Sequence, residues 1–206
     1  MAATTSGDGP DARPGDNPLA QVEAWYGAAV AAGLPEADAM ALATATPDGR
    51  PSVRFVLLKG VDADGIRFYT NYESRKGREL EANPRAAVTL YWQPLHRSIR
   101  MEGPVERLTP EESDAYYESR ERGSRLGAWA SDQSRPLSGG RDTLDARLRD
   151  AEERFPGEVP RPGHWGGYRL RPDAVEFWTG RPNRLHDREH FLLQQDGSWR
   201  AERLFP

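Results

Sequence analysis

Apolar positions follow a helical period in the first segment that is expected to fold, residues 17–33. They recur every three or four residues, at Leu19, Val22, Tyr26, Ala29 and Val30. Asn17 and Pro18 are typical of a helix start, and Gly33 is typical of a helix end. The pattern therefore predicts one amphipathic helix.

Apolar runs of strand length follow this helix and predict a series of strands. Residues 40–46 and 51–59 flank the turn Pro47-Asp48-Gly49-Arg50, which is a hairpin signal. A third strand is expected at residues 65–70, and the tight turns between these three strands predict a meander. The remaining strands are predicted at residues 86–92, 98–108, 165–170, 175–178, 191–194 and 199–204.

Three further helices are predicted between or beside the strands. Ser74 can cap a short helix over residues 75–81, and Thr109-Pro110-Glu111-Glu112 is a capping box that opens a helix toward Arg120. Residues 141–155 have the charge pattern of a surface helix. The order of elements indicates a mainly β fold with peripheral helices, built on an antiparallel barrel.

Length and composition limit this fold to one domain. Residues 1–16 are rich in Gly, Pro, Asp and Ala and predict a flexible arm, so residues 17–206 form the expected domain. No apolar run approaches the roughly 20 residues that span a bilayer, so no membrane segment is expected. The first 18 residues lack a basic start and an apolar run, which favours a cytoplasmic location.

The charge and the missing cysteines exclude several functions. A net charge of −4 argues against a general nucleic-acid surface. Without Cys the chain has no thiolate, so redox chemistry would need a cofactor. His186 and His190 are four residues apart but lack the Glu of a zinc-protease helix, so no metal site is expected.

A first group of polar residues has the composition of a phosphate site. It consists of Arg54, Lys59, Thr70, Ser74, Arg75 and Lys76, on two strands and the start of a helix. A helix N-terminus offers free N–H groups, and cations in its first turn oppose the helix dipole unless an anion is present. The alternative is an ordinary solvated basic patch.

A second group, Tyr116, Arg120 and Ser124, has a spacing of four residues. On one helix these residues would present a phenol, a guanidinium and a hydroxyl on a single face, which suits a second phosphate. In isolation, core packing of the tyrosine and a surface ion pair of the arginine explain the spacing better.

A third group lies near the end of the chain. Strand alternation would direct Arg184, His186 and Arg188 to one side, close to Trp178. Guanidinium groups both stack on rings and pair with oxyanions, so this surface suits a planar anionic ligand. A structural role for the histidine is the alternative.

Eight short motifs in register identify a family resemblance. They are Arg54-Phe-Val-Leu-Leu-Lys59, Phe68-Tyr-Thr-Asn71, Ser74-Arg-Lys76, Gly127-Ala-Trp129, Gln133-Ser134, Trp165-Gly-Gly167, Val175-Glu-Phe-Trp178 and Arg184-Leu-His-Asp-Arg188. In this order they resemble the pyridoxamine 5'-phosphate oxidase family over residues 17–206. The resemblance implies a homodimer of FMN-binding split barrels with flavin sites between the subunits, which uses dioxygen to oxidise pyridoxamine or pyridoxine 5'-phosphate.

The resemblance also assigns site residues. The implied FMN contacts are Arg54, Phe55, Val56, Leu57, Leu58, Lys59, Tyr69, Thr70, Arg75, Lys76, Ser98, Gln133, Ser134, Trp178 and Arg188. The implied contacts of the substrate phosphate are Lys59, Tyr116, Arg120 and Ser124. Arg184 and His186 would cover the pyridine ring and act as the catalytic residues.

Two departures from the family pattern keep alternatives open. Ser98 stands where the family commonly has a Gln that reaches the flavin, and the arm before Asn17 lacks the Arg and Tyr that fold over the substrate in many members. One alternative is a phenazine-biosynthesis-type flavin oxidase, although Lys59, Tyr116, Arg120 and Ser124 favour a phosphorylated substrate. The other is a non-catalytic protein that binds FMN or pyridoxal phosphate.

Overall fold

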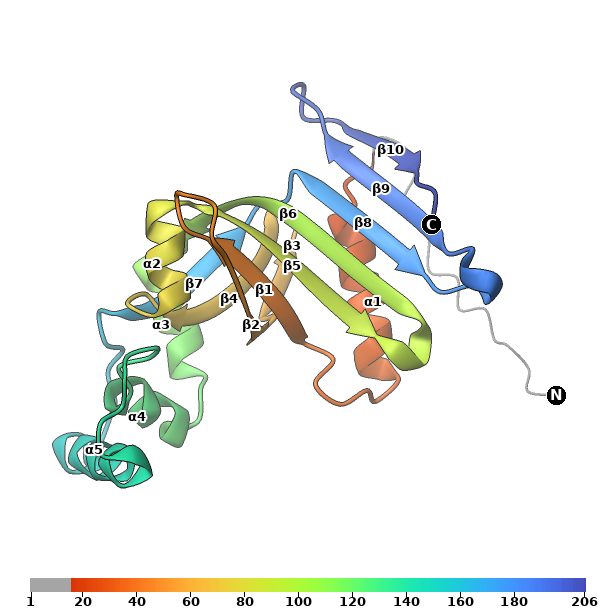
Figure 1. The fold of residues 1–206 in the computed structure, drawn as a ribbon. Helices are drawn as coiled ribbons and strands as arrows, with labels where there is room; N and C mark the ends of the chain where they lie inside the picture. Colours follow the sequence, from red (N-terminus) through yellow and green to blue (C-terminus); the bar gives the residue numbers. More distant parts are fainter. Residues whose placement is uncertain (1–15) are drawn as a thin grey trace.

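The computed structural model describes residues 16–206, which form ten strands and five α-helices (Figure 1). In chain order these are α1 (Leu19–Ala31), β1 (Ala39–Ala45), β2 (Pro51–Leu57), β3 (Gly60–Asp62), β4 (Gly65–Asn71), α2 (Arg75–Ala82), β5 (Arg85–Trp92), β6 (Arg97–Arg107), α3 (Pro110–Glu118), α4 (Arg122–Ala130), α5 (Gly140–Arg154), β7 (Trp165–Leu170), β8 (Ala174–Thr179), β9 (Asp187–Leu193) and β10 (Trp199–Arg203). The expected N-terminal arm lies outside the described residues except for Asp16, and so does the segment in which the Arg and Tyr of the substrate lid were sought.

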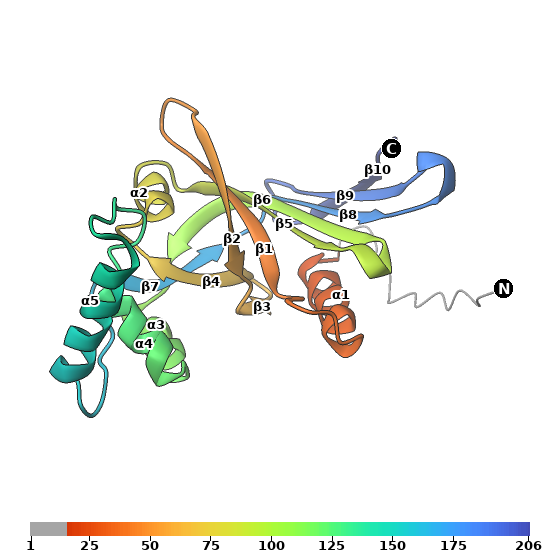
Figure 2. The ribbon, with the colours of Figure 1, turned by 60° about the horizontal axis from the view of Figure 1, so that its bottom comes forward.

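All strand pairs in the described chain are antiparallel. The main path runs β10-β9-β8-β6-β5-β1-β2, and a branch runs β6-β7-β4-β3. The long strand β6 joins the two, because residues 97–102 pair with β8 and residues 105–107 pair with β7. No ladder connects β2 to β4, so the curled sheet stays open on that side (Figure 2). The prediction of an antiparallel split barrel with peripheral helices is confirmed.

The predicted meander of the first three strands is wrong. The segment expected to be a connecting turn contains β3, which pairs with β4 in a tight hairpin. This hairpin carries β4 away from β2, and β4 pairs instead with β7 over six residues, from Ile66–Leu170 to Asn71–Trp165. The pairing buries Ile66 and Phe68 completely, which favours it over a partly exposed position beside β2.

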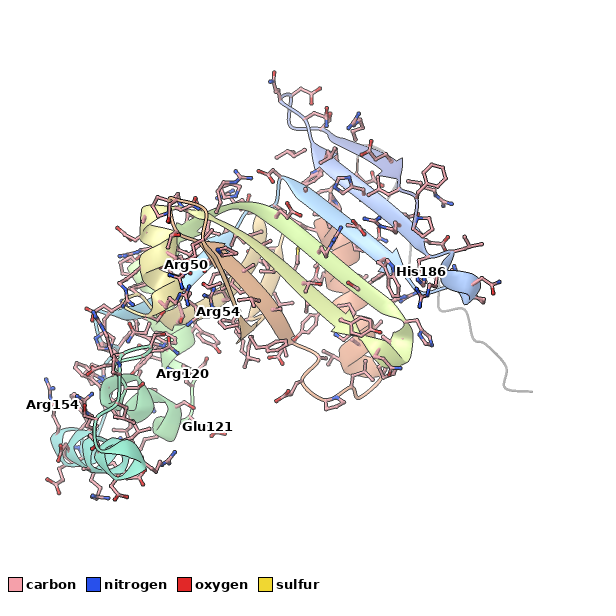
Figure 3. The ribbon with its side chains drawn as sticks, viewed as in Figure 1. Arg50, Arg54, Arg120, Glu121, Arg154 and His186 are labelled. Carbon is pink, nitrogen blue, oxygen red and sulfur yellow. The ribbon has the colours of Figure 1, made fainter. Side chains whose placement is uncertain are left out.

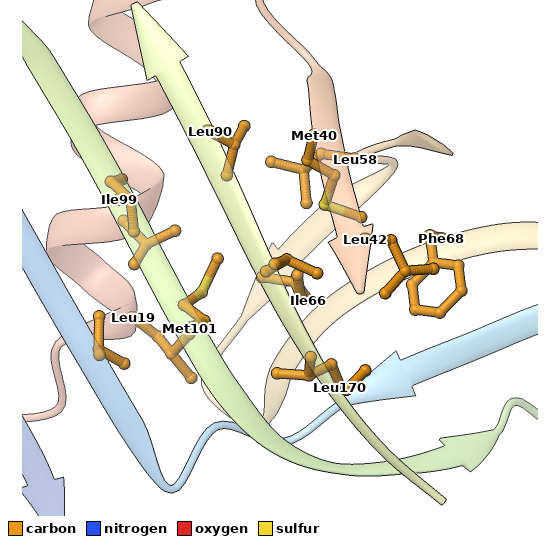
Figure 4. Packing of buried hydrophobic residues seen from close by; sticks show 14 of the residues in the cluster. Leu19, Met40, Leu42, Leu58, Ile66, Phe68, Leu90, Ile99, Met101 and Leu170 are labelled. Atoms are coloured by element: carbon orange, nitrogen blue, oxygen red, sulfur yellow. The ribbon is translucent and has the colours of Figure 1, made fainter. Parts of the chain in front are cut away.

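The core lies between the two branches of the sheet (Figure 4). Alternate residues of the strands point inward, as the period of two requires, and include Met40, Leu42, Leu90, Ile99, Met101, Ile66, Phe68 and Leu170. Helix α1 adds its apolar stripe to the same cluster, and Trp25 meets Phe177 edge to face at 5.1 Å. Each fully buried side chain of this kind contributes about 1.5 to 3 kcal/mol.

The predicted helix caps are present. Ser74 Oγ accepts the backbone N–H of Gly77 at 3.2 Å, and Thr109 and Glu112 form the reciprocal capping box of α3. A side chain at Gly77 would place its Cβ 2.0 Å from the carbonyl oxygen of Tyr72. Only glycine therefore lets the first turn of α2 lie this close to β4.

The helical segment after β6 differs from the expected single face. Helix α3 ends at Glu118 and α4 begins at Arg122, so Tyr116, Arg120 and Ser124 lie on two helices and the link between them. Ser119 Oγ donates to the carbonyl oxygen of Tyr116 at 2.7 Å, which satisfies an acceptor left free by the helix end.

Helices α4 and α5 pack together beside the barrel, at the end away from β8–β10 (Figure 2). Their small core contains Leu126, Ala151 and Val159. The predicted surface helix at residues 141–155 is confirmed as α5. Within residues 16–206, none of the helices has the length and apolar character to span a bilayer.

Candidate functional site

Most of the predicted site residues gather in one hollow of about 620 Å³, which we call the Lys76 cavity. It lies where β2 and β4 meet the helices α3 and α4. Its lining consists of Phe55, Val56, Leu57, Lys59, Tyr69, Thr70, Asn71, Lys76, Tyr116, Arg120, Glu121, Ser124, Gly127, Ala128, Ser131, Gln133 and Trp165. The whole second group of polar residues singled out in the sequence therefore shares one cavity with three members of the first group, Lys59, Thr70 and Lys76.

Lys76 is a buried cation at this cavity, with 6% of the residue exposed. Its Nζ donates to Thr70 Oγ1 at 3.0 Å, to Gln133 Oε1 at 3.1 Å and to Ser74 Oγ at 3.4 Å. Among the described residues no carboxylate pairs with it. Burial, with a smaller effect from the charge of Arg54, lowers the pKa of Lys76 to about 8. A buried ammonium with only neutral acceptors is suited to bind an anion.

Arg54 and Arg75, two predicted FMN contacts, share the buried carboxylate of Glu79. Arg54 Nη2 lies 3.3 Å from Glu79 Oε2, and Arg75 Nε lies 2.9 Å from Glu79 Oε1. Thr44 and Ser52 each donate a hydroxyl to Glu79 Oε2 at 2.5 Å. Burial alone would raise the pKa of Glu79, but hydrogen bonds from Ser52, Thr44 and Arg75 together with the charge of Arg75 lower it to about 2.

The charges around α2 do not cancel. Arg54, Arg75 and Lys76 are three cations in mutual electrostatic contact, and Glu79 is their one carboxylate partner in the described chain. Two positive charges therefore remain without a counter-ion. A phosphate monoester carries about −1.5 to −2 at neutral pH, so its charge matches this excess.

An aromatic stack forms the opposite wall of the Lys76 cavity. The rings of Tyr69 and Tyr116 lie 3.8 Å apart, and Trp165 is nearly parallel to both. Arg120 lies over Trp165 at 4.5 Å, and its Nη1 is buried without a hydrogen-bond partner in the described structure. A side chain at Gly167 would place its Cβ 2.7 Å from the Tyr69 ring, so glycine is needed for the stack.

Lys59 occupies the rim of the same cavity and forms an ion pair with Asp38. The distance from Lys59 Nζ to Asp38 Oδ2 is 2.6 Å, and both side chains are about a quarter exposed. Leu58, the preceding residue, is buried in the core, so only its backbone can approach a ligand.

A second hollow of about 490 Å³, the Trp178 hollow, contains three further predicted residues. It is lined by Tyr91, Ser98, Arg100, Glu176, Trp178, Arg188 and Pro206. Glu176 accepts from Arg188 Nε at 2.8 Å and is also paired with Arg100. Burial would raise the pKa of Glu176, but hydrogen bonds from Arg188 and Arg100 lower it.

The remaining predicted residues line neither hollow. Arg184 is the last residue of a 3-10 turn, Pro182–Arg184, and has a φ of 61°. His186 precedes β9, which begins at Asp187, so the expected strand alternation of Arg184, His186 and Arg188 is wrong. His186 instead packs on Trp178 with ring centroids 4.6 Å apart. Ser134 is exposed in the loop between α4 and α5, with a φ of 70°.

The two hollows occupy different parts of one chain. Figure 3 shows Arg54 and Arg120 on the helix-bearing side, whereas His186 lies at the far end of the sheet. The outer face of β2 exposes Val53, Phe55 and Leu57, and β5 exposes Tyr91. Phe55 and Leu57 line the Lys76 cavity, and Tyr91 lines the Trp178 hollow, so exposed apolar residues border both.

Sequence reasoning missed four residues that hold the site together: Asp38, Glu79, Trp165 and Glu176. Glu79 carried a local signal, since it stands four residues after Arg75 on a short helix. Trp165 and Glu176 were noted only as parts of family motifs. The partners of Asp38 and Glu176 are remote in sequence or lie across a strand pair, and no local pattern indicates them.

Comparison with known proteins identifies the family. Residues 27–155 match the family model described as pyridoxamine 5'-phosphate oxidase. The chain belongs to the pyridoxamine 5'-phosphate oxidase family. Residues 165–206 match the pyridoxine 5'-phosphate oxidase C-terminal dimerisation region, which here comprises β7–β10 and contains Trp178, Arg184, His186 and Arg188.

Curated relatives of this family cover nearly the whole chain. A pyridoxine/pyridoxamine 5'-phosphate oxidase from Cupriavidus metallidurans is 56% identical over 190 residues, which cover 92% of this chain and 89% of the relative. A relative with the same name from Bordetella petrii is 54% identical, with 92% and 90% covered.

Solved structures show the same architecture. PhzG from Burkholderia lata, in complex with tetrahydrophenazine-1-carboxylic acid, has a TM-score of 0.87 and 34% identity, and the match covers 92% of this chain and 93% of that one. A pyridoxamine 5'-phosphate oxidase-related, FMN binding protein from Nostoc punctiforme has a TM-score of 0.70 at 21% identity, with 88% and 97% covered. The second likeness concerns the fold alone.

Proposed function

We propose that the protein is an FMN-dependent oxidase that converts pyridoxamine or pyridoxine 5'-phosphate to pyridoxal 5'-phosphate, with dioxygen as acceptor and hydrogen peroxide as product. The amine substrate would also take up water and release ammonia. The observation that carries this proposal is the Lys76 cavity. It combines a buried ammonium without a carboxylate partner and a guanidinium with a buried, unpaired N–H. Two cations without a carboxylate partner in one cavity match two phosphorylated ligands, a cofactor and a substrate.

The residues around α2 fit the phosphate of FMN. Lys76 supplies an ammonium that has no counter-ion, and Arg54 and Arg75 add guanidinium groups that Glu79 holds in place. Gln133 accepts hydrogen bonds from both Lys76 and Thr70, so it lies close enough to contact the same phosphate. The ring system would extend along residues 55–59, at the end of β2 and just beyond it, where Phe55 and Leu57 are exposed.

The complete site requires a second copy of the chain. Ser98, Trp178 and Arg188 are expected FMN contacts but lie in a separate hollow. A homodimer would bring the Trp178 hollow of one subunit to the Lys76 cavity of the other and would cover the apolar face of β2. The match to a dimerisation region supports this arrangement.

The substrate phosphate is assigned to Lys59, Tyr116, Arg120 and Ser124. These groups lie together on the lining of the Lys76 cavity although α3 and α4 are separate helices. Holding a phosphate remote from the reacting carbon sets the position of the ring, and productive geometry needs reacting atoms about 3 to 3.5 Å apart. Bound FMN would accept the hydride from the 4' carbon and pass the electrons to dioxygen.

Arg184 and His186 are assigned to the pyridine ring and its substituent. The backbone N–H of Arg181 donates to His186 Nδ1 at 3.1 Å. Because a backbone N–H can only donate, the neutral ring carries its proton on Nε2. His186 therefore presents an N–H donor to the ligand, and Trp178 packs against one side of the imidazole ring.

The decisive experiment measures peroxide production by the purified, FMN-saturated protein. We expect a yellow dimer that turns over pyridoxamine 5'-phosphate or pyridoxine 5'-phosphate and is much less active on the unphosphorylated vitamers. Binding of FMN without peroxide production would indicate a non-catalytic binding protein. Turnover of a tricyclic, phosphate-free substrate alone would indicate the phenazine-type alternative, and a colourless monomer that takes up no FMN would contradict the proposal.

A further inference from the structure

We propose that Trp165 is a positioning residue that holds Arg120 in place for the phosphate of the substrate. The inference deepens the proposed function and rests on its assignment of Arg120 to that phosphate. Trp165 acts through the guanidinium and not by contact with the reacting atoms.

Arg120 lacks the partner that usually fixes a half-buried arginine. No carboxylate pairs with it in residues 16–206, and its Nη1 is buried without a hydrogen bond. Burial lowers the pKa of Arg120, and the nearby Tyr116 and Tyr117 offset this effect only in part. Its closest aromatic neighbours are Trp165, at 4.5 Å from the guanidinium carbon to the ring centroid, and Tyr117, at 5.6 Å.

Trp165 is itself held firmly. Its ring is 12° from parallel with Tyr69 and 8° from parallel with Tyr116, and Tyr117 meets it edge to face at 5.1 Å. Its carbonyl oxygen accepts from Arg161 Nη1 at 2.8 Å, and Arg161 is anchored by Asp114 at 2.6 Å. The tryptophan therefore offers a rigid surface at the start of β7.

Contact with an aromatic ring in place of a carboxylate has a specific chemical consequence for Arg120. A carboxylate partner would occupy the N–H groups of Arg120 and cancel its charge, and an incoming phosphate would have to displace it. An aromatic ring attracts the cation over its face and leaves the N–H edge and the full charge available. Trp165 can thus orient Arg120 without competing with the phosphate.

The test compares Trp165→Leu and Trp165→Phe in the FMN-loaded dimer, by equilibrium dialysis of pyridoxal 5'-phosphate and of pyridoxal. We expect Trp165→Leu to weaken binding of the phosphorylated ligand by about three- to tenfold. Pyridoxal affinity should change by less than about twofold. Trp165→Phe keeps a ring beneath the guanidinium and should recover most of the loss. In an Arg120→Ala background, Trp165→Leu should cause no further weakening.

A matched control is available in α1. Trp25 is 6% exposed and Trp165 is 7% exposed, and Arg97 lies over Trp25 at 4.5 Å, the same distance as Arg120 over Trp165. Trp25 lines neither hollow. Trp25→Leu should therefore lower thermal stability as a core substitution does, while the ratio of the two ligand affinities stays unchanged.

Three results would overturn the inference. Equal weakening of pyridoxal and pyridoxal 5'-phosphate by Trp165→Leu would show a general packing role, as would full additivity with Arg120→Ala. A Trp165→Phe variant that binds the phosphorylated ligand as poorly as Trp165→Leu, with the parent's melting temperature, would exclude the cation–ring contact. If Arg120→Ala leaves the ratio of the affinities for pyridoxal 5'-phosphate and pyridoxal unchanged, the proposed phosphate site is wrong and the inference fails with it.

Discussion

Replacing Lys76 by methionine should stabilise the ligand-free protein and weaken its binding of FMN. The ammonium is 6% exposed and its pKa is lowered from 10.5 to about 8, chiefly by burial. This difference corresponds to roughly 3 kcal/mol of destabilisation of the folded state at pH values below about 8, where Lys76 is protonated in both the folded and the unfolded chain. Methionine has a similar length, and Thr70 still donates to Gln133, so no buried polar group loses its last partner.

The expected net gain in unfolding free energy is roughly 1 to 2 kcal/mol at pH 7, because the lost hydrogen bonds of Lys76 offset part of the desolvation cost. For a chain of this size each kcal/mol raises the melting temperature by about 2 to 4 °C. FMN affinity should fall about ten- to a hundredfold, since a charge-assisted hydrogen bond is worth about 1.5 to 3 kcal/mol.

The pH dependence of Lys76→Met gives the sharper test. Between about pH 8 and 10.5 the folded parent has lost the Lys76 proton while the unfolded chain still binds it. The unfolding free energy of the parent therefore increases with pH in this range, whereas the variant has no such group. The difference in unfolding free energy between the variant and the parent becomes smaller. Urea unfolding of apoprotein at several pH values measures this, and FMN titration monitored by flavin fluorescence measures binding.

Lys59→Met is the matched control, because Lys59 is the other lysine of the chain and pairs with Asp38 near the surface. It should give no stabilisation at pH 7. A Lys76→Met apoprotein less stable than the parent, or a stability gap that is constant from pH 8 to 10.5, would refute the view that Lys76 is a desolvated cation awaiting an anion.

Three further predictions concern other parts of the site. Glu79→Gln should destabilise the apoprotein by about 1 to 3 kcal/mol at pH 7, because the pKa of Glu79 is lowered to about 2; the loss should vanish as the pH falls from about 4.5 toward 2 in acid-unfolding curves. Ser98→Gln should tighten FMN binding about two- to twelvefold, since the Trp178 hollow leaves room for an added amide, and weaker binding in titration would show that the site has repacked around serine. His186→Ala should lower kcat by up to about a hundredfold in steady-state assays if it positions the ring, and an unchanged kcat would leave it a structural role.

Local sequence patterns were sufficient for most of the helices and strands, although not for β3 and α4. Periods of two and 3.6 residues, caps such as Ser74 and the turn at Gly49 depend on neighbours within a few positions. The described strands other than β3, four of the five described α-helices and the caps of α2 and α3 could therefore be located without knowledge of the fold. The cation-rich start of α2 was also visible, because an unfavourable charge at a helix dipole is a local property.

Partners remote in sequence were decided only by the tertiary structure. The pairing of β4 with β7 depends on how well two distant segments bury Ile66 and Phe68, and no local period encodes that choice. Tyr116, Arg120 and Ser124 line one cavity although they do not lie on the single helix that was expected. The helix is interrupted because α4 packs against α5 and does not continue the axis of α3.

The sequence by itself thus determined which residue types are present and which local elements they form. The fold decided which charges are buried together. Glu79 pairs with both Arg54 and Arg75, Lys76 has no carboxylate partner among the described residues, and Trp178 and Arg188 lie apart from the Lys76 cavity. The physical reason is range: helix and strand periods arise from backbone geometry over a few residues, whereas burial and electrostatic pairing depend on contacts that exist only once the chain has folded.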